Sequence, residues 1–516
     1  MELAAAAAPA EGWVRNRRYS FAEKIVLAIL LVTLADWVFF LQRTGSTLGI
    51  YAALLATVTV IVRPAILRSR SALAAAAAAL LFASALFDDP SLLAAALFWT
   101  AATMAALLPR AGFDDGWRWT KRLAVQLVLA IVLPVRDWVR LRVARRRRGP
   151  IGMVRRLPVL WLPLIGSLLF LALFASANPL IGDAFARLDL LVVVGGFSLT
   201  RLAFWVALTV VVWSLLRPAA FRLGPAGQRE VDFSLPGVSA ASVTLSLLAF
   251  NIIFALQNGL DLAFLWSRAS LPEGMTLAEY AHRGAYPLIA TALLAALFVL
   301  VILRPGSPLA ESATIRRLVY LWIGQNVLLV ASTILRTVDY VEAYSLTILR
   351  IAALLWMGLV AVGLLLICYR IWRRKSGAWL INANLLAASI VLAGCAFVDL
   401  GAAAASWNVR HARDVGGRGT ALDLCYVQRL GSSALLPLIE MESRPLAPQL
   451  RERVSWARNL AMDRLETRQR DWHGWTFRGH RRLGVAHRLV AARRLPRVHA
   501  NRRPCGGFAL TAPAVE

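Results

Sequence analysis

The chain alternates long apolar runs with short polar connections from residue 21 to residue 400. A helix that crosses the hydrocarbon core of a bilayer needs about 20 apolar residues, with roughly 17–25 usual. Only helices and closed barrels satisfy the peptide backbone in lipid. The pattern therefore predicts an all-α, polytopic transmembrane helical bundle of about 11 spans, at 21–41, 47–62, 71–87, 91–108, 157–180, 193–216, 240–266, 285–303, 317–335, 346–370 and 379–400.

The connections between these runs differ in charge from one to the next. Loops that are rich in Arg and Lys stay on the cytoplasmic side of a membrane. The alternation of basic and non-basic connections over eleven spans therefore predicts a cytoplasmic N-terminal segment at 1–20 and a C-terminal tail on the opposite side of the membrane. The basic clusters lie at 15–24, 63–70, 110–122, 140–156, 217–229, 304–317 and 370–375.

One apolar segment does not fit the alternation. Residues 123–135 are apolar but short, and both flanks are basic, so a true crossing would place residues 145–148, all Arg, outside. Basic helices that lie in the headgroup region have this character. We therefore expect an interfacial or re-entrant helix at 120–141. It would close an N-terminal transmembrane region, 21–141, and precede a core transmembrane bundle, 142–400.

The character of the chain changes after residue 400. The tail, residues 401–516, holds 20 Arg, nine acidic residues and no long apolar run. Within it, 446–470 has the spacing of an amphipathic helix. We expect an extramembrane, basic, helical tail at 401–485 and a disordered C-terminus at 486–516.

Four cysteines divide between the two parts of the chain. Cys368 and Cys395 lie in apolar runs, where a cysteine is a small hydrophobic residue. Cys425 and Cys505 lie in the tail and could pair if the tail faces an oxidising space.

Composition narrows the function classes. The chain is 59% hydrophobic and 17% charged, with a mean hydropathy of +0.62, which suits a membrane protein. The net charge of +28 could indicate nucleic-acid binding, but the basic residues form short clusters between apolar runs. We expect the lipid bilayer as partner, a membrane or envelope protein as a candidate second partner, and no nucleic acid. No phosphate-loop, metal, serine-hydrolase or dinucleotide motif occurs, so we expect no cofactor, no metal and no catalytic residue.

Polar residues inside the apolar runs are costly and therefore informative. At 100° per residue, four of them in 240–266 share an arc of about 120°. A second stripe of about 60° follows the run 317–335 if its helix continues past the interface. The first stripe holds Asn251, Gln257, Asn258 and Asp261; the second holds Gln325, Ser332, Arg336 and Asp339.

The second stripe leads to Arg350, and the loop 267–284 faces the same expected side. Arg guanidinium groups and carboxylates could together hold a zwitterionic or anionic group. The alternative is that these residues only join helices, by hydrogen bonds of about 0.6 kcal/mol each and by mutually neutralising pairs. The candidate ligand-binding residues are Gln257, Asn258, Asp261, Glu279, His282, Arg283, Arg336, Asp339 and Arg350.

Several blocks of the chain resemble one family of bacterial multi-pass membrane proteins. They include FNIIFALQNGLDLAFLW (250–266), LAEYAHRGAYPLIATALL (277–294), FASANPLI (174–181) and LDLCYVQRLGSSALLPLI (422–439). The resemblance is to domain of unknown function 4173, which is related to 4153, and it covers roughly 155–445. It implies an inner-membrane location and supplies no catalytic residue.

These observations favour a non-enzymatic accessory or sensory protein with an outward-facing intramembrane polar site. A secondary transporter of a small polar or charged solute is the first alternative, and a polar path reaching the cytoplasmic half would favour it. A membrane-embedded lipid-handling enzyme is the second alternative.

Overall fold

The computed structural model describes residues 19–146, 167, 198–219, 239–266 and 312–496. These residues form helices and contain no strand, which confirms the all-α bundle. Most of the helices begin at a Ser, Thr or Asp whose side chain accepts a hydrogen bond from a backbone N–H of the first turn. Such residues stabilise a helix N-terminus because the first amides have no partner within the helix.

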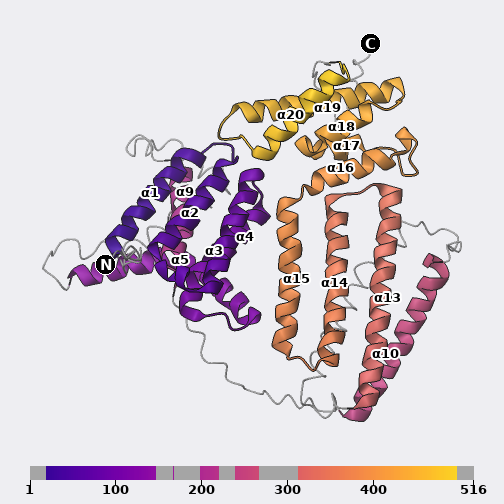
Figure 1. Ribbon diagram of the computed structural model, residues 1–516, viewed down its shortest axis with the longest axis horizontal. Coiled ribbons are helices and arrows are strands. Elements are labelled where there is room, and N and C mark those ends of the chain that lie inside the picture. Colours follow the sequence, from indigo (N-terminus) through magenta and orange to yellow (C-terminus); the bar gives the residue numbers. More distant parts are fainter. Residues whose placement is uncertain (1–18, 147–166, 168–197, 220–238, 267–311, 497–516) are drawn as a thin grey trace, which may run out of the picture.

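Two groups of long helices stand side by side, and a layer of shorter helices covers one end of both (Figure 1). The first group consists of α1 (Phe21–Phe39), α2 (Thr47–Val62), α3 (Arg70–Asp88), α4 (Leu92–Ala111), α5 (Gly116–Arg146) and α9 (Leu199–Leu216), with the 3-10 turn η1 (Pro64–Arg68) between α2 and α3. The second consists of α10 (Ala240–Asp261), with the π-helical turn η2 (Leu262–Trp266), α13 (Ala313–Tyr344), α14 (Ile348–Trp372) and α15 (Gly377–Phe397).

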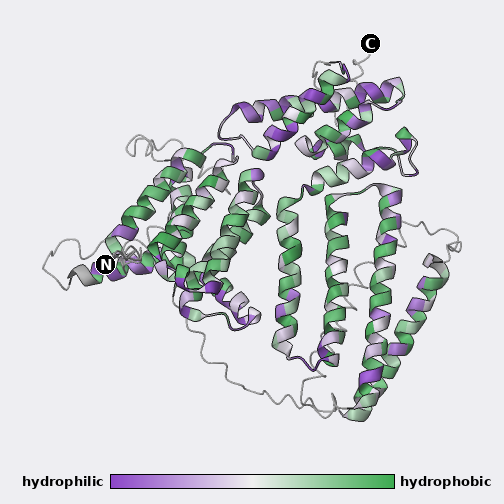
Figure 2. Ribbon diagram, in the orientation of Figure 1, coloured by the Kyte–Doolittle hydropathy of each residue, from purple (hydrophilic) through white to green (hydrophobic). Residues whose placement is uncertain are grey.

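We call the covering layer the cap, and it extends from Leu400 to Ala492. It consists of α16 (Leu400–His411), η3 (Arg413–Val415), α17 (Leu424–Arg429), η4 (Gly431–Ala434), α18 (Leu435–Glu442), α19 (Pro448–Arg470) and α20 (Phe477–Ala492). Its helices are markedly more hydrophilic than the long helices beneath them (Figure 2).

The long helices suit a bilayer. Among the described residues, α3, α4, α9, α10, α13, α14 and α15 are long and apolar enough to cross one, and α2 is a shorter apolar helix. Many of their large apolar side chains are exposed, such as Leu245, Ile252 and Leu365. The chain is therefore a multi-pass transmembrane protein. Apart from residue 167, the expected spans at 157–180 and 285–303 lie outside the described residues.

The expected boundary between residues 141 and 142 does not separate two packing units. Helix α9, which we assigned to the later bundle, packs against α1 and α5 in the core of the first group. Besides apolar packing, a polar contact that hydropathy does not show joins α9 to α1. Asp36 of α1 accepts hydrogen bonds from Arg201 Nε at 3.0 Å and from Trp205 Nε1 at 2.8 Å.

Helix α5 covers the interfacial segment expected at 120–141, and it is longer. Its hydrogen-bond partners among the described residues lie near helix ends remote from the cap. The Gly116 amide donates to Asn382 near the start of α15, and Asp137 accepts from Trp213 near the end of α9. Whether α5 lies in the headgroup region stays a prediction.

The expected start of disorder at residue 486 is wrong. Helix α20 continues to Ala492, since Ala486, Leu489 and Val490 pack in an apolar cluster with α18 and α19. Beyond the helix, Arg458 Nη2 donates to the carbonyl of Pro496 at 2.7 Å. Residues 497–516 lie outside the described residues.

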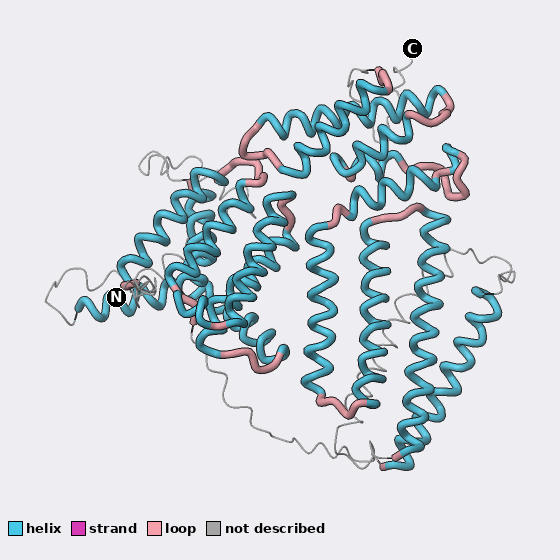
Figure 3. Tube along the Cα trace, viewed as in Figure 1, coloured by secondary structure: helices cyan, strands magenta, loops and turns pink. Residues whose placement is uncertain are grey.

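The cap meets four helix ends on one face of the bundle. They are the α1–α2 and α3–α4 connections, the α13–α14 connection and the end of α15, which the loops in Figure 3 mark. The opposite face carries the basic positions Arg63, Arg70, Arg110 and Arg373 at the other ends of the same helices. The helix ends that meet the cap instead carry the acidic residues Asp88 and Asp399, so the two sets of helix ends differ in charge.

Candidate functional site

The two polar stripes predicted from the sequence face each other along α10 and α13. The two helices run parallel. From one contact to the next, the residue on each helix advances by seven positions. Asn251 Nδ2 donates to the Leu318 carbonyl at 3.1 Å, and Asn258 Nδ2 donates to the Gln325 carbonyl at 3.1 Å. Gln325 Nε2 in turn donates to Asn251 Oδ1 at 3.1 Å. We call this polar contact between α10 and α13 the seam.

An ion pair lies toward the cap end of the seam. Arg336 Nη2 contacts Asp261 Oδ1, and both side chains are buried, at 5% and 0% exposure. Gln257 Nε2 donates to the same Oδ1 at 3.0 Å. An isolated charge at this depth would be costly, so the pairing explains why the apolar helices tolerate both residues.

Several buried oxygens of α10 and α13 have no hydrogen-bond donor among the described residues. Burying an acceptor without a donor costs about 1–3 kcal/mol. Such an atom therefore indicates either a structural cost or a place for a donor that comes from outside the chain. The oxygens are Asn258 Oδ1, Asp261 Oδ2, Gln325 Oε1 and Asn326 Oδ1.

The structure brings together only part of the predicted set. Gln257, Asn258, Asp261 and Arg336 belong to the seam, and Asp339 lies three residues beyond Arg336 on α13. The face of α10 is as predicted, because Ile252 and Leu256 are exposed while Asn251, Asn258 and Asp261 are buried. Glu279, His282 and Arg283 lie outside the described residues.

Arg350, which the sequence groups with Asp261 and Arg336 as a candidate ligand-binding residue, has other partners in the structure. Its Nη1 donates to the Tyr344 carbonyl at 2.6 Å and contacts the Ser345 carbonyl, and its guanidinium lies 4.4 Å from the Tyr340 ring centroid. Carbonyl groups at a helix C-terminus carry partial negative charge and attract cations. The end of α13 thus holds Arg350 apart from the Asp261–Arg336 pair.

Sequence reasoning missed the contact between the cap and the first group of helices. The α19–α20 connection docks on the α1–α2 connection. The Ser46 amide donates to the Trp475 carbonyl at 2.7 Å, and the Phe477 amide donates to Ser46 Oγ at 3.0 Å. A Cβ built on Gly45 would lie 2.3 Å from the Trp475 carbonyl oxygen and 2.4 Å from that of His473. Only glycine fits there without a shift of the backbone.

Ion pairs fasten α20 to two more helix ends. Arg478 Nε donates to Asp88 Oδ2 at 2.7 Å, and its Nη2 donates to the Phe397 carbonyl at 2.9 Å. One turn later, Arg482 contacts Asp399, which also accepts from Ser433 Oγ at 2.9 Å. We call these contacts of α20 and the α19–α20 connection the clamp.

The electrostatics of Asp399 reflect this setting. Burial raises the pKa of its carboxyl, but the Ala402 amide, Arg482 and Ser433 stabilise the carboxylate and outweigh burial. The pKa of Asp399 therefore lies below its usual value of 3.8. The charged form is the one that holds the clamp.

The cap also holds the α13–α14 connection, beyond the seam. Asn408 Oδ1 accepts from the Leu346 amide at 2.6 Å, and its Nδ2 donates to the Leu346 carbonyl at 2.9 Å. Tyr426 accepts from the Ile348 amide at 2.9 Å. The helix that carries Arg336 therefore ends directly on the cap.

The cysteines of the apolar runs and of the tail differ in oxidation state. Cys368 and Cys395 are free thiols, whereas Cys425 of α17 is in a disulfide. The remaining cysteine of the chain, Cys505, lies outside the described residues. A stable disulfide is typical of an oxidising compartment.

One sequence signal could have located the clamp. The segment DWHGW at 471–475 combines a glycine with three aromatic residues, which suits a docking turn better than a metal site. Trp472 lies 5.5 Å from Trp37, and Trp475 lies 6.1 Å from Phe87, as ring-centroid distances. The sequence around this segment does not indicate which surface of the bundle it contacts.

Comparison with known families gives one match. The profile of the family described as domain of unknown function (DUF4153) matches residues 72–441. The match begins within α3, earlier than the expected 155, and ends within α18. No curated protein and no solved structure matches the chain. Because the match spans well over half of the sequence, the chain belongs to the DUF4153 family of domains of unknown function.

Proposed function

We propose that this protein is a non-enzymatic accessory or sensory component of the bacterial cytoplasmic membrane, with the cap on the extracytoplasmic side. The distribution of charge supports this orientation. Arg63, Arg70, Arg110 and Arg373 lie at helix ends remote from the cap, and short loops rich in Arg and Lys stay inside. The disulfide at Cys425 supports it independently.

The proposed sensory element is the seam. One oxygen of the Asp261 carboxylate is engaged by Arg336 and Gln257, while the other has no donor within the described part of the chain. Asn258 Oδ1, one helical turn away, also lacks a donor. A small ligand that brings N–H or O–H groups would satisfy these acceptors, so Gln257, Asn258, Asp261 and Arg336 are the proposed binding residues.

One observation carries the link between seam and cap. Helix α13 bears Arg336 and ends at the connection that Asn408 grips by two hydrogen bonds. Arg336 lies eight residues before the end of α13, which corresponds to about 12 Å along a helix. A change in the Asp261–Arg336 pair would shift α13 and thereby move the connection that Asn408 of the cap binds.

A secondary transporter is the second candidate. Asn251 and Leu318 extend the seam toward the ends remote from the cap, and Leu318 lies only five residues from the start of α13. A polar path that reaches both halves is what a solute pathway requires. Transport of a solute into sealed vesicles, lost in Asp261→Asn, would favour this alternative.

The test of the proposal separates charge from shape. Asp261→Asn keeps the size and much of the hydrogen bonding while it removes the charge. We expect it to abolish the phenotype that the wild-type gene restores to a deletion strain, beyond any fall in membrane abundance, to which the phenotype is normalised because removing one charge of a buried pair also destabilises the fold. Gln257→Leu, which removes one hydrogen bond and no charge, should be much milder. Loss of phenotype that only follows loss of protein would make the seam a structural contact.

A further inference from the structure

A long groove lies between α1, α5 and α9 in the first group of helices, with a volume of about 750 Å³. Along α1 its lining extends from Phe21 to Asp36, which is about 22 Å of helix at 1.5 Å per residue. One leaflet of a bilayer holds about 15 Å of hydrocarbon, half of the core. The groove is therefore long enough for an acyl chain. Its wall is mainly apolar and includes Phe21, Ile25, Val32, Trp138, Trp205 and Trp213.

The polar groups of this wall already have partners within the protein. Trp205 Nε1 donates to Asp36 Oδ1 at 2.8 Å, and Trp213 Nε1 donates to Asp137 Oδ2 at 3.1 Å. Asp36, at the end of the groove nearer the cap, also accepts from Arg201 at 3.0 Å. An apolar chain in the groove would therefore displace few hydrogen bonds of these groups with water.

The other end of the groove lies at the basic face and is bordered by cations. The lining positions of α9 repeat every four residues and end at Trp213, and Arg217 follows at the same interval. The Arg217 guanidinium lies 4.8 Å from the ring centroid of Phe21. On α5, the Arg142 guanidinium lies 3.5 Å from the ring centroid of Trp138. Two helices thus each place a cation on an aromatic ring of the groove wall.

The positive charge at this end exceeds the negative charge within the described part of the chain. Asp137 is shared by Arg136 and Arg217, both at 3.5 Å. Arg142 Nη1 is buried and has no hydrogen-bond acceptor among the described residues. A buried donor without an acceptor costs about 1–3 kcal/mol, so an acceptor from outside the chain would stabilise it.

More cations gather where α2, α4 and α9 end, next to Arg217. Arg63 donates to the carbonyls of Ala106 at 3.2 Å and of Leu216 at 3.3 Å. Burial, and then the charges of Arg110 and Arg217, lower the pKa of Arg63 to about 10. The neighbouring charges that act on Arg63 are thus cationic, and this end of the bundle attracts anions.

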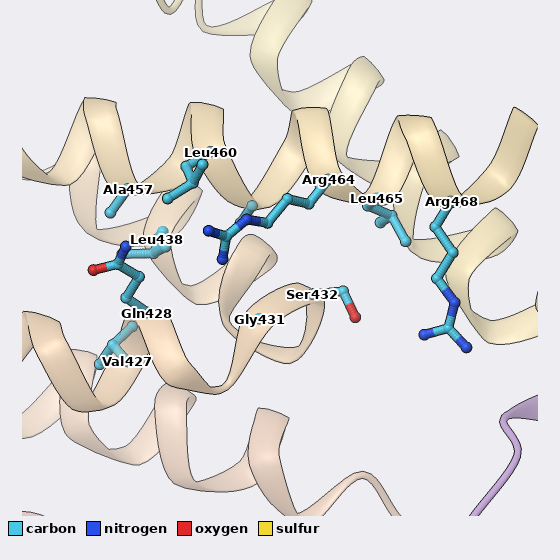
Figure 4. Close-up of a pocket in the computed structure, with 11 residues that line it drawn as sticks. Val427, Gln428, Gly431, Ser432, Leu438, Ala457, Leu460, Arg464, Leu465 and Arg468 are labelled. Atoms are coloured by element: carbon cyan, nitrogen blue, oxygen red, sulfur yellow. The ribbon is translucent and has the colours of Figure 1, made fainter. Parts of the chain in front are cut away.

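The cavity of the cap lacks this combination. It has a volume of about 150 Å³ and lies between α19 and the turn that joins α17 to α18. Arg464 and Arg468 extend to opposite sides of Ser432 (Figure 4). Arg468 also donates to two backbone carbonyls. Neither its size nor its donors suit a lipid.

We propose that the groove between α1, α5 and α9 binds an anionic phospholipid of the leaflet on the basic face. One acyl chain lies along α1 and α9. The phosphate lies at the basic end, where Arg142 Nη1 donates to it and the charge of Arg217 attracts it. Basic pockets between transmembrane helices are typical headgroup sites. The seam lies in the other group of helices, so this site is independent of the proposed sensory element.

The experiment uses the full-length protein in detergent micelles and measures the rise in melting temperature as a probe is added. The probes are phosphatidylglycerol, phosphatidylethanolamine with the same acyl chains, and glycerol 3-phosphate, which has no acyl chain. We expect phosphatidylglycerol to bind about tenfold more tightly than phosphatidylethanolamine, and glycerol 3-phosphate not to stabilise the protein. Equal affinity for the two lipids, or equal stabilisation by glycerol 3-phosphate, would overturn the proposal.

Filling the groove tests where the acyl chain lies. Thr209→Trp on α9 and Ile29→Trp on α1 each place a large side chain in the lining, and both should abolish stabilisation by phosphatidylglycerol. Two variants keep the test decisive if one of them does not fold. Val206→Trp, at an exposed position of α9 outside the lining, is the matched control and should respond like the wild type. A normal lipid response in folded filling variants would contradict the site.

Removing a charge tests where the headgroup lies. Arg142→Gln should weaken the affinity for phosphatidylglycerol about tenfold and change that for phosphatidylethanolamine much less. Arg373→Gln is the matched control, because Arg373 is also exposed on the basic face and lies 4.9 Å from the ring centroid of Trp372. It should bind like the wild type. Equal loss in both arginine variants, or no response of the wild type to either lipid, would overturn the proposal.

Discussion

Arg478 and Asp88 lie 390 residues apart in sequence and form an ion pair at 2.7 Å that joins the cap to the end of α3. Both side chains are largely buried, at 13% and 22% exposure. The pair sits beside the docked α19–α20 connection, so it fixes the register of the cap on the bundle. The stability of the cap therefore depends on residues at the two ends of the chain.

Reversing this pair tests the clamp. Asp88→Arg places three cations together, because Arg478 and Arg481 both face Asp88. We expect it to weaken cap docking by about 1–3 kcal/mol. The measurement is the rate at which a protease cleaves the α19–α20 connection. The double variant Asp88→Arg with Arg478→Asp should recover much of the protection, and no recovery would contradict a direct pairing.

Gly45 offers a test that involves no charge. A methyl group there would overlap the backbone carbonyls of Trp475 and His473, so Gly45→Ala should destabilise docking by about 1–3 kcal/mol. Gly377→Ala is the matched control, since a Cβ at that position meets nothing within 4 Å. Thermal unfolding of both variants in detergent decides the matter. Equal melting temperatures would mean that the α1–α2 connection does not receive the cap as described.

Asp399 predicts a pH dependence. Its pKa is depressed below 3.8 in the folded protein, so the stability that it contributes is fully present above that value. It is lost as the pH falls through the depressed pKa, because the proton removes the charge that Arg482 contacts. The gap in stability between the wild type and Asp399→Asn should therefore narrow below about pH 4. A gap that stays constant down to pH 3 would show that the charge of Asp399 is not involved.

The buried ion pair of the seam predicts that removing one charge costs more stability than removing both. Arg336→Leu leaves Asp261 buried without its cation, which should cost about 3–5 kcal/mol. Asp261→Asn with Arg336→Leu removes both charges and should be more stable than Arg336→Leu alone. Melting temperatures of the purified variants measure this. A double variant that is no more stable than the single one would argue against pairing in the membrane.

Hydropathy and helical periodicity predicted those features of the fold that depend on residues close together in sequence. The run 47–62 coincides with α2, and the polar face of α10 is the one that 100° spacing gives. These features follow from local sequence because a span must be apolar along its length and a stripe must turn with the helix. The seam could be anticipated since two polar stripes in lipid need partners.

Other features depend on which distant segments meet. Hydropathy cannot tell that α9 joins α1, because the contact depends on a polar pair, Asp36 and Arg201, from segments far apart in sequence. Arg350 was grouped with Asp261 as a candidate site residue, yet its guanidinium contacts the carbonyls at the end of α13. Residues 486–492 form no long apolar run, and their helix is stabilised because Leu489 and Val490 meet α18 and α19.

The orientation of the cap is the central claim, and labelling of single cysteines in intact cells tests it most directly. The parent carries Ala at Cys368 and Cys395, the two free thiols. Ser443→Cys places an exposed thiol on the cap, and Lys375→Cys places one on the basic face. With a membrane-impermeant maleimide, we predict labelling at residue 443 before permeabilisation and at residue 375 only afterwards. The reverse order, or labelling of neither residue before permeabilisation, would contradict an extracytoplasmic cap.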